Sequence, residues 1–297
     1  MKIENKNQDS SAPFRAGGTL AIIGTGLIGG SFSLCLKERG LVKHTIGVSR
    51  TQKSANKALE LGIVDEILPL EDAVKKADLI YVAIPVDATI TTMQTIMDLV
   101  TDKQIVVDAG STKYALCSAL ANHPKRNRFV ASHPMWGTEY SGPEAAVREA
   151  FAGRACVICE REKSDKNALE AVEKIYRELG MHIVYMDAEA HDIHAAYVSH
   201  ISHITSFALA NTVLEKEKEE DAIFELAGGG FESTVRLAKS NPAMWVPIFM
   251  QNKENILDVL NEHISQLRKF KASLEKENAD YLLELIENAN KIRRIIK

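Results

Sequence analysis

The chain of 297 residues contains only four cysteines and has no strong excess of either charge. Four cysteines in a chain of this length make no disulfide framework, so we expect buried free thiols. A formal net charge of −4 gives no support for a nucleic-acid partner. Residues 1–16 are polar and lack the apolar stretch of a secretory signal. The sequence therefore predicts a cytoplasmic protein with a flexible tail at its start.

Long hydrophobic runs are also missing. The nearest candidate is the uncharged stretch at residues 20–36, but four glycines, two serines and a threonine dilute it. A membrane-spanning helix needs about 20 predominantly apolar residues. We therefore expect no membrane association.

A glycine-rich motif of the form G-x-G-x-x-G is present at Gly24–Gly30, between an apolar strand and a helix. Gly24 is expected to allow the tight turn, and Gly26 the close approach of a pyrophosphate. Gly29 would permit contact between helix and strand. The helix start offers free N–H groups and a positive dipole end to phosphates. The predicted cofactor contacts here are Gly24, Gly26, Leu27, Ile28 and Gly29.

The residues after the second expected strand, 44–48, predict the cofactor type. A carboxylate at this point would bind the ribose hydroxyls of NAD and repel a 2′-phosphate. This chain instead has Ser49, Arg50 and Thr51, which supply hydroxyl groups and a positive charge. The combination favours NADP over NAD. Stacking of Arg50 on the adenine of either cofactor is the alternative.

Strand and helix patterns alternate up to about residue 187. Further strands are expected at 77–84, 104–108, 128–131, 155–159 and 182–185. Helices are expected at 31–39, 51–61, 70–76, 88–100, 113–121 and 164–179. This alternation predicts an α/β fold, with a Rossmann-type doubly wound, mostly parallel sheet in residues 17–187.

Beyond that point strand patterns cease, and a second domain is expected. The remaining helical patterns are at 188–215, 221–224, 233–239, 243–270 and 274–296. Residues 188–297 are therefore expected to form an all-helical domain.

Polar residues follow several of the expected strands, where ligands bind in open α/β sheets. Pro85 comes directly after the strand expected at 77–84, beside the expected cofactor crevice, and Asp108 ends the strand expected at 104–108. Ser111 would then lie near the nicotinamide. A cap on the following helix is the alternative role for Ser111, and the two roles are compatible.

His133 stands in the segment Ser132-His-Pro-Met-Trp-Gly-Thr-Glu-Tyr-Ser-Gly142. Proline and glycine suggest a stiff loop, and the surrounding polar side chains are poor material for a core. A histidine in such a setting is a candidate general base. The alternative is a surface turn whose histidine caps a neighbour.

The helical region adds further polar residues. Ser199 and His203 are one helical turn apart and share a face. The histidines here lack the nearby glutamate of a zinc motif, so we expect no metal and favour a cleft lined by polar groups. Arg236 is a candidate for bidentate binding of a substrate carboxylate. An ion pair between Arg236 and Glu232 is the alternative.

Taken in order, these motifs resemble those of the prephenate/arogenate dehydrogenase family of tyrosine biosynthesis. The resemblance rests on Gly24–Ser31, Asp108–Lys113, His133–Glu139, His191–Asp192 with Ser199–His200 and His203, and Arg236–Trp245. It implies oxidative decarboxylation of prephenate to 4-hydroxyphenylpyruvate, or of arogenate to tyrosine. It also implies a homodimer built through the helical domain.

The resemblance further implies roles for individual residues. His133 would take the proton of the substrate C4 hydroxyl, and Ser111 would position both groups. Arg236 would bind a substrate carboxylate, with His203 near the other end of the substrate. The remaining expected substrate contacts are Thr138, Glu139, Ser199 and Trp245. A different reductase of the same architecture, such as a pyrroline-5-carboxylate reductase or a 3-hydroxyacid dehydrogenase, is the alternative.

Overall fold

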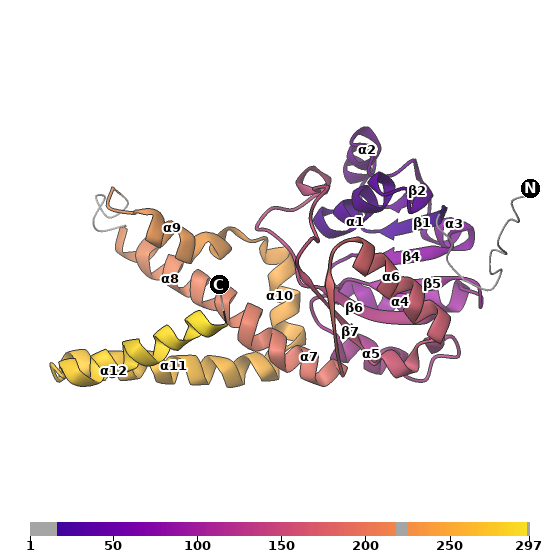
Figure 1. The fold of residues 1–297 in the computed structure, drawn as a ribbon. Helices are drawn as coiled ribbons and strands as arrows, with labels where there is room; N and C mark the ends of the chain where they lie inside the picture. The colour runs from indigo at the N-terminus through magenta and orange to yellow at the C-terminus, as the bar shows by residue number, and fades with distance from the viewer. Residues whose placement is uncertain (1–16, 218–224, 296–297) are drawn as a thin grey trace, which may run out of the picture.

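The computed structural model describes residues 17–217 and 225–295 (Figure 1). The expected tail at 1–16 and the short helix at 221–224 lie outside these ranges. The first part of the chain forms an eight-stranded sheet in the order β3-β2-β1-β4-β5-β6-β7-β8. Its strands are β1 (Gly18–Ile23), β2 (Val42–Val48), β3 (Glu66–Ile67), β4 (Leu79–Val82), β5 (Ile105–Asp108), β6 (Phe129–Pro134), β7 (Ala155–Cys159) and β8 (His182–Met186).

The sheet is parallel except between β6 and β7, which are antiparallel. From β1 the chain winds first to β2 and β3 on one side, then to β4 and β5 on the other. This reversal of strand order creates a crevice at the carboxyl ends of β1 and β4, where such sheets bind ligands. The predicted Rossmann-type α/β fold is confirmed.

Helices cover both faces of the sheet. They are α1 (Leu27–Glu38), α2 (Gln52–Glu60), α3 (Leu70–Lys76), α4 (Val86–Leu99), α5 (Tyr114–Leu120) and α6 (Lys166–Glu178). Leu20 and Ile22 of β1 pack on the side of α1 and α6, and Ala21 and Ile23 pack on the side of α3, α4 and α5. Alternate residues of a strand point to opposite faces, so a strand buried on both sides must be apolar throughout.

The second part of the chain is helical among the described residues. It comprises α7 (Ala188–Ala195), a π-helical turn (Ala196–His200), α8 (Ile201–Glu217), α9 (Gly229–Val235), a 3₁₀ turn (Arg236–Lys239), α10 (Pro242–Gln251), α11 (Lys253–Glu275), α12 (Ala279–Asn290) and a last 3₁₀ turn (Lys291–Arg294). Figure 1 shows two arms reaching away from the sheet, one of α8 and α9 and one of α11 and α12. The expected all-helical character of this region is confirmed.

Some helices begin or end elsewhere than expected. The first begins at Leu27, earlier than predicted, because helix follows the glycine turn directly. The helix expected over 243–270 is interrupted at Asn252, which separates α10 from α11. The helix expected over 274–296 starts only after Glu277, whose φ of 51° lies in the left-handed region. A left-handed residue ends a helix because the following backbone can no longer continue its hydrogen-bond pattern.

Strand β6 runs further than expected and changes the setting of His133. The predicted stiff loop at this point is wrong, because β6 continues through His133 to Pro134 and pairs with β7, placing His133 opposite Val157. Proline has no N–H for a strand ladder, which suits it to the end of a strand. Strand β3 was not expected, since two residues are too few to give a periodic pattern.

The cysteines are all free and buried, as expected: Cys35, Cys117, Cys156 and Cys159. Across the described ranges, every helix is too short or too polar to cross a lipid bilayer.

Candidate active site

The glycine-rich turn connects β1 to α1 at the crevice. Gly24 has a φ of +98°, a conformation that side chains other than glycine rarely adopt. A Cβ on Gly29 would collide with the carbonyl oxygen of Gly24 and with Ile22. Gly26, by contrast, faces open space, with no atom within 4 Å of an added Cβ. The turn therefore leaves room at Gly26 for a pyrophosphate beside the start of α1, where Leu27 and Ile28 lie.

Beside this turn lie the three residues that are expected to determine the preference for NADP over NAD. The hydroxyl oxygens of Ser49 and Thr25 are 2.6 Å apart, which ties the end of β2 to the glycine turn. Thr51 caps α2, where its hydroxyl accepts a hydrogen bond from the Ser54 backbone N–H at 3.2 Å. Arg50 is exposed between them. Of these three side chains, Ser49 and Thr51 are thus held by hydrogen bonds within the chain, whereas that of Arg50 is exposed to solvent.

A fully buried ion pair lies beneath the crevice. The ammonium of Lys113 contacts Oδ2 of Asp108 and donates to the carbonyl of Ser132 at 2.8 Å. The Asp108 carboxylate also accepts hydrogen bonds from the backbone N–H of Gly110 and of Ser132, at 2.9 and 3.1 Å. A buried ion pair needs such additional bonds to offset desolvation. Asp108 thus supports the loops on either side and has no exposed surface of its own.

His133 lies on β6 and contacts a second histidine from the helical domain. Its Nδ1 is 2.8 Å from Nε2 of His191 on α7, and the ring planes are inclined by 64°. Nδ1 of His191 is in turn 2.8 Å from Oδ1 of Asp192. Desolvation by burial is the main cause that holds the pKa of His133 well below its ordinary value, and the nearby His191 and Lys113 lower it further. A neutral imidazole at physiological pH can accept a proton, which suits a general base.

Two loop residues predicted to lie at the crevice are placed near the strand ends. Pro85 is exposed and directly precedes α4. Ser111 is half-buried between β5 and α5. The alternative in which Ser111 caps α5 is wrong, because the helix begins after Lys113 and its first N–H groups donate to the carboxylate of Asp192.

The π-helical turn places further groups on the helical side. The His203 ring stacks on Trp245, with centroids 3.4 Å apart, and its Nδ1 is 3.1 Å from the carbonyl oxygen of Ser199. Desolvation lowers the pKa of His203. Among the described residues, Nε2 of His200 and Nε1 of Trp245 are buried without a hydrogen-bond partner. π-helical turns are frequent at functional sites, and this one ends at His200, whose ring centroid lies 6.0 Å from that of Trp245.

Arg236 contacts the sheet domain. Its Nη1 donates to Oε2 of Glu139 at 2.8 Å, in the loop after β6 where Thr138 is exposed. The alternative pair of Arg236 with Glu232 is wrong, since the cation near Glu232 is Lys239, at 3.9 Å. A hydrogen bond from its own backbone N–H, and then the Arg236 guanidinium, lower the pKa of Glu139.

Asn252 and Gln251, at the break between α10 and α11, are contact residues that the sequence analysis missed. The Asn252 amide donates to the carbonyl of Asp192 at 2.7 Å and to Nδ1 of His200 at 3.1 Å. Gln251 contacts the Thr112 hydroxyl and donates to the carbonyl of Val86 at 3.3 Å. A break inside an apolar helical pattern, marked by two adjacent amides, was the available signal.

His191 and Asp192 were noted in the sequence only as a motif, without roles.

In the part of the chain that the structure describes, no cluster of three His, Cys, Asp or Glu side chains has the geometry to hold a metal ion.

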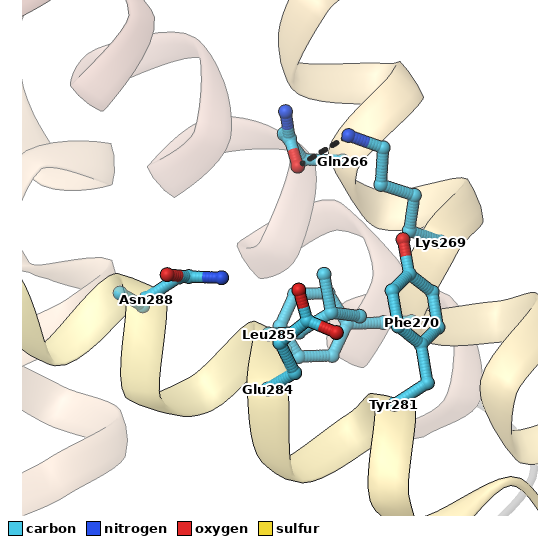
Figure 2. A pocket seen from close by; sticks show the side chains of 8 residues that line it. Gln266, Lys269, Phe270, Tyr281, Glu284, Leu285 and Asn288 are labelled. Carbon is cyan, nitrogen blue, oxygen red and sulfur yellow. Dashed lines mark hydrogen bonds between the residues drawn. The ribbon is translucent and has the colours of Figure 1, made fainter.

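A separate shallow pocket lies far along the C-terminal arm, between α11 and α12 (Figure 2). Its lining includes Lys269, Phe270, Tyr281, Leu285 and Asn288, and none of the predicted site residues. This pocket is therefore separate from the candidate active site around His133.

Comparison with known proteins identifies the family. Residues 32–185 match the model of the prephenate dehydrogenase nucleotide-binding domain, and residues 187–288 match that of the prephenate dehydrogenase dimerization domain. The chain belongs to the prephenate dehydrogenase family. Its members are oxidoreductases, and this membership decides against the alternative reductases of similar architecture.

Individual relatives in this family agree with the assignment. The prephenate dehydrogenase of Bacillus subtilis is 32% identical, over 93% of this chain and 75% of that protein. The cyclohexadienyl dehydrogenase of Zymomonas mobilis is 30% identical, over 94% of this chain and 96% of that protein. The crystal structure of Aquifex aeolicus prephenate dehydrogenase with hydroxyphenyl propionate and NAD+ superimposes with a TM-score of 0.86 at 30% identity, covering 94% of this chain and 98% of that one.

Proposed function

We propose that this protein catalyses the NAD(P)-dependent oxidative decarboxylation of prephenate to 4-hydroxyphenylpyruvate, or of arogenate to tyrosine. The single observation that carries the proposal is His133, a neutral imidazole beside the ligand-binding edge of a dinucleotide-binding sheet. The substrate is a cyclohexadienol with a hydroxyl group at C4 and a carboxylate at C1. Its oxidation needs a base at the C4 hydroxyl.

The glycine turn at Gly24–Gly30 would hold NAD(P)+, whose nicotinamide would supply the hydride acceptor. Nε2 of His133, the ring nitrogen not occupied by His191, accepts the hydrogen bond and then the proton of the C4 hydroxyl as hydride leaves C4. The bond from C1 to its carboxylate breaks, carbon dioxide departs, and its electron pair completes an aromatic ring. The proton returns to the phenolate oxygen, so the base is regenerated.

Arg236 binds a substrate carboxylate in this proposal. Its guanidinium is half exposed and already holds the Glu139 carboxylate, a stand-in for the group it would receive. Substrate would displace Glu139, which with Thr138 shapes and gates the entrance. The stacked rings of His203 and Trp245 would form a platform for the substrate ring or side chain, and Ser199 and Ser111 are the remaining proposed contacts.

NADP is the favoured cofactor. No carboxylate follows β2 at the point where one would exclude a 2′-phosphate. Because Thr51 already caps α2, the phosphate would be received by Ser49 and Arg50. The Ser49 hydroxyl lies 2.6 Å from that of Thr25, next to the glycine turn that would hold the pyrophosphate.

A homodimer through the helical domain completes the proposal. Residues 187–288 match a dimerization domain. Large apolar side chains are exposed on both arms, including Leu214, Leu257, Leu267, Leu283 and Ile286. A second copy would bury these side chains and remove apolar surface from water.

Steady-state assays with prephenate and arogenate, each with NADP+ and NAD+, test the activity through the appearance of reduced nicotinamide. We expect turnover of at least one substrate, with aromatic product and carbon dioxide in equal amounts. Absence of turnover with all four combinations would overturn the proposal.

A further inference from the structure

The contact of His133 with the helical domain continues into an ordered chain of three side chains. Nδ1 of His133 is 2.8 Å from Nε2 of His191, and Nδ1 of His191 is 2.8 Å from Oδ1 of Asp192. His191 and Asp192 are both buried, so water does not compete for these atoms. We infer that His191 and Asp192 are positioning residues that fix the tautomer of His133 and leave its Nε2 unprotonated toward the cleft. The inference rests on the proposed function for its catalytic consequence.

Asp192 determines the direction of every hydrogen bond in this chain. Its carboxylate accepts the backbone N–H of Lys113 at 2.7 Å and of Tyr114 at 3.0 Å. Both donors lie at the start of α5, where a helix has unpaired N–H groups and a positive dipole end. Because a backbone N–H can only donate, both oxygens of Asp192 act as acceptors here.

The tautomers of His191 and His133 follow from the accepting role of the Asp192 carboxylate. Nδ1 of His191 must carry a hydrogen in order to donate to Asp192, so Nε2 of a neutral His191 has a lone pair. Nδ1 of His133 must then donate to that lone pair, which leaves Nε2 of His133 without a hydrogen. This is the atom that the reaction requires as a base.

The same arrangement supports the state after proton transfer. Once Nε2 of His133 has taken a proton, the imidazolium donates from Nδ1 to His191, and the carboxylate of Asp192 lies behind it. Charge-assisted hydrogen bonds of this kind are stronger than neutral ones. The other ionisable groups facing these rings are Lys113, from the loop before α5, and His200, whose Nδ1 accepts from Asn252. Neither is hydrogen-bonded to the His133 ring, so the direction is set by Asp192.

Three variants separate this positioning role from a role in folding alone. His191→Leu removes the acceptor for His133, whereas His191→Gln keeps an amide oxygen able to accept that bond. Asp192→Asn lets an amide N–H face Nδ1 of His191, which reverses both tautomers and leaves His133 with a hydrogen on Nε2. His194→Gln is the matched control, since His194 lies on the same helix, is exposed, and has the carbonyl of Ala190 as its hydrogen-bond partner.

We expect His191→Leu and Asp192→Asn to lower kcat by roughly 10²–10⁴-fold with KM changed less than about threefold, the range for losing a general base. His191→Gln should retain at least about ten times the kcat of His191→Leu, and His194→Gln should match the unmodified protein. Equal kcat values for His191→Leu and the unmodified protein, or equal losses in the Leu and Gln variants, would overturn the inference.

A measurement on the resting protein makes the test independent of activity. Long-range ¹H–¹⁵N spectra of protein labelled at histidine distinguish protonated from unprotonated ring nitrogens, and His133→Asn identifies the His133 signals. We expect Nε2 of His133 to be unprotonated in the unmodified protein and Nδ1 to be unprotonated in Asp192→Asn. An unprotonated Nδ1 in the unmodified protein overturns the inference even if turnover is normal. The expected tautomers without any turnover would instead reject the proposed function and leave the positioning intact.

Discussion

Arg236 donates to Glu139 at 2.8 Å and so joins the helical domain to the loop after β6, across 97 positions of sequence. The Arg236 side chain is 50% exposed and that of Glu139 only 12%. A pair with one exposed partner contributes little to stability, typically about 0.2–1 kcal/mol. A substrate carboxylate can therefore replace Glu139 at small energetic cost.

Replacing Arg236 should chiefly impair substrate binding. Arg236→Gln removes a charge-assisted contact of roughly 1.5–3 kcal/mol, which predicts a KM raised about ten- to hundredfold and a smaller change in kcat. Steady-state kinetics with prephenate and arogenate measure both. Lys239→Gln is the matched control, because Lys239 is an exposed cation in the same turn. Similar KM values for both variants would contradict the assignment.

Replacing His133 should abolish chemistry but not cofactor binding. Asparagine keeps a polar side chain but cannot take the proton, so His133→Asn should lower kcat by roughly 10²–10⁴-fold. Cofactor affinity, measured by fluorescence titration, should stay within about threefold of the original. His182→Asn, an exposed change at the start of β8, serves as the control. A His133→Asn protein with nearly unchanged kcat would remove His133 from the mechanism.

The residues after β2 predict a preference for NADP. Charge-assisted contacts to a 2′-phosphate of roughly 1.5–3 kcal/mol give kcat/KM about ten- to hundredfold higher with NADP than with NAD. Ser49→Asp should reverse the preference, because a carboxylate repels the phosphate and accepts the ribose hydroxyls. Arg50→Ala should weaken NADP alone. Equal weakening of both cofactors would show that Arg50 stacks on the adenine instead.

Acid should destabilise the protein through buried histidines. Burial lowers the pKa of His200 to about 4, from an ordinary 6.5. As the pH falls, His200 is protonated near pH 6.5 in the unfolded chain but only near pH 4 in the folded protein. The free energy of unfolding therefore decreases as the pH drops through this window. The loss from His200 is on the order of 3 kcal/mol.

Urea unfolding at pH 7 and pH 4.5 measures this effect. His200→Gln should make the pH dependence shallower, whereas His194→Gln on the exposed side of α7 should leave it unchanged. The same slope in His200→Gln and the unmodified protein would assign the acid sensitivity to other groups.

Local patterns predicted the sheet and the glycine turn because their causes are local. The apolar run of β1 and the positive φ of Gly24 each depend on residues that are adjacent in the sequence. The contact between His133 and His191 spans 58 positions and depends on how α7 packs against the sheet, so no spacing rule predicts it. The strand setting of His133 likewise depends on pairing with β7, a partner that the sequence pattern alone does not specify.

The wrong pairing of Arg236 has a similar explanation. Residues four apart face each other only while the helix continues. Helix α9 ends at Val235 and a 3₁₀ turn begins at Arg236, which rotates its side chain away from Glu232. A change of helix type within a few residues leaves little trace in composition.

The break at Asn252 has a mechanical consequence. This residue is fixed to Asp192 and His200, and α11, with 23 residues, extends directly from it. At 1.5 Å per residue the helix is about 35 Å long, so a rotation of about 5° at its base swings its far end by about 3 Å. Any change in helix direction that begins at Asn252, beside the imidazole of His200, would therefore be enlarged at the far end of the arm.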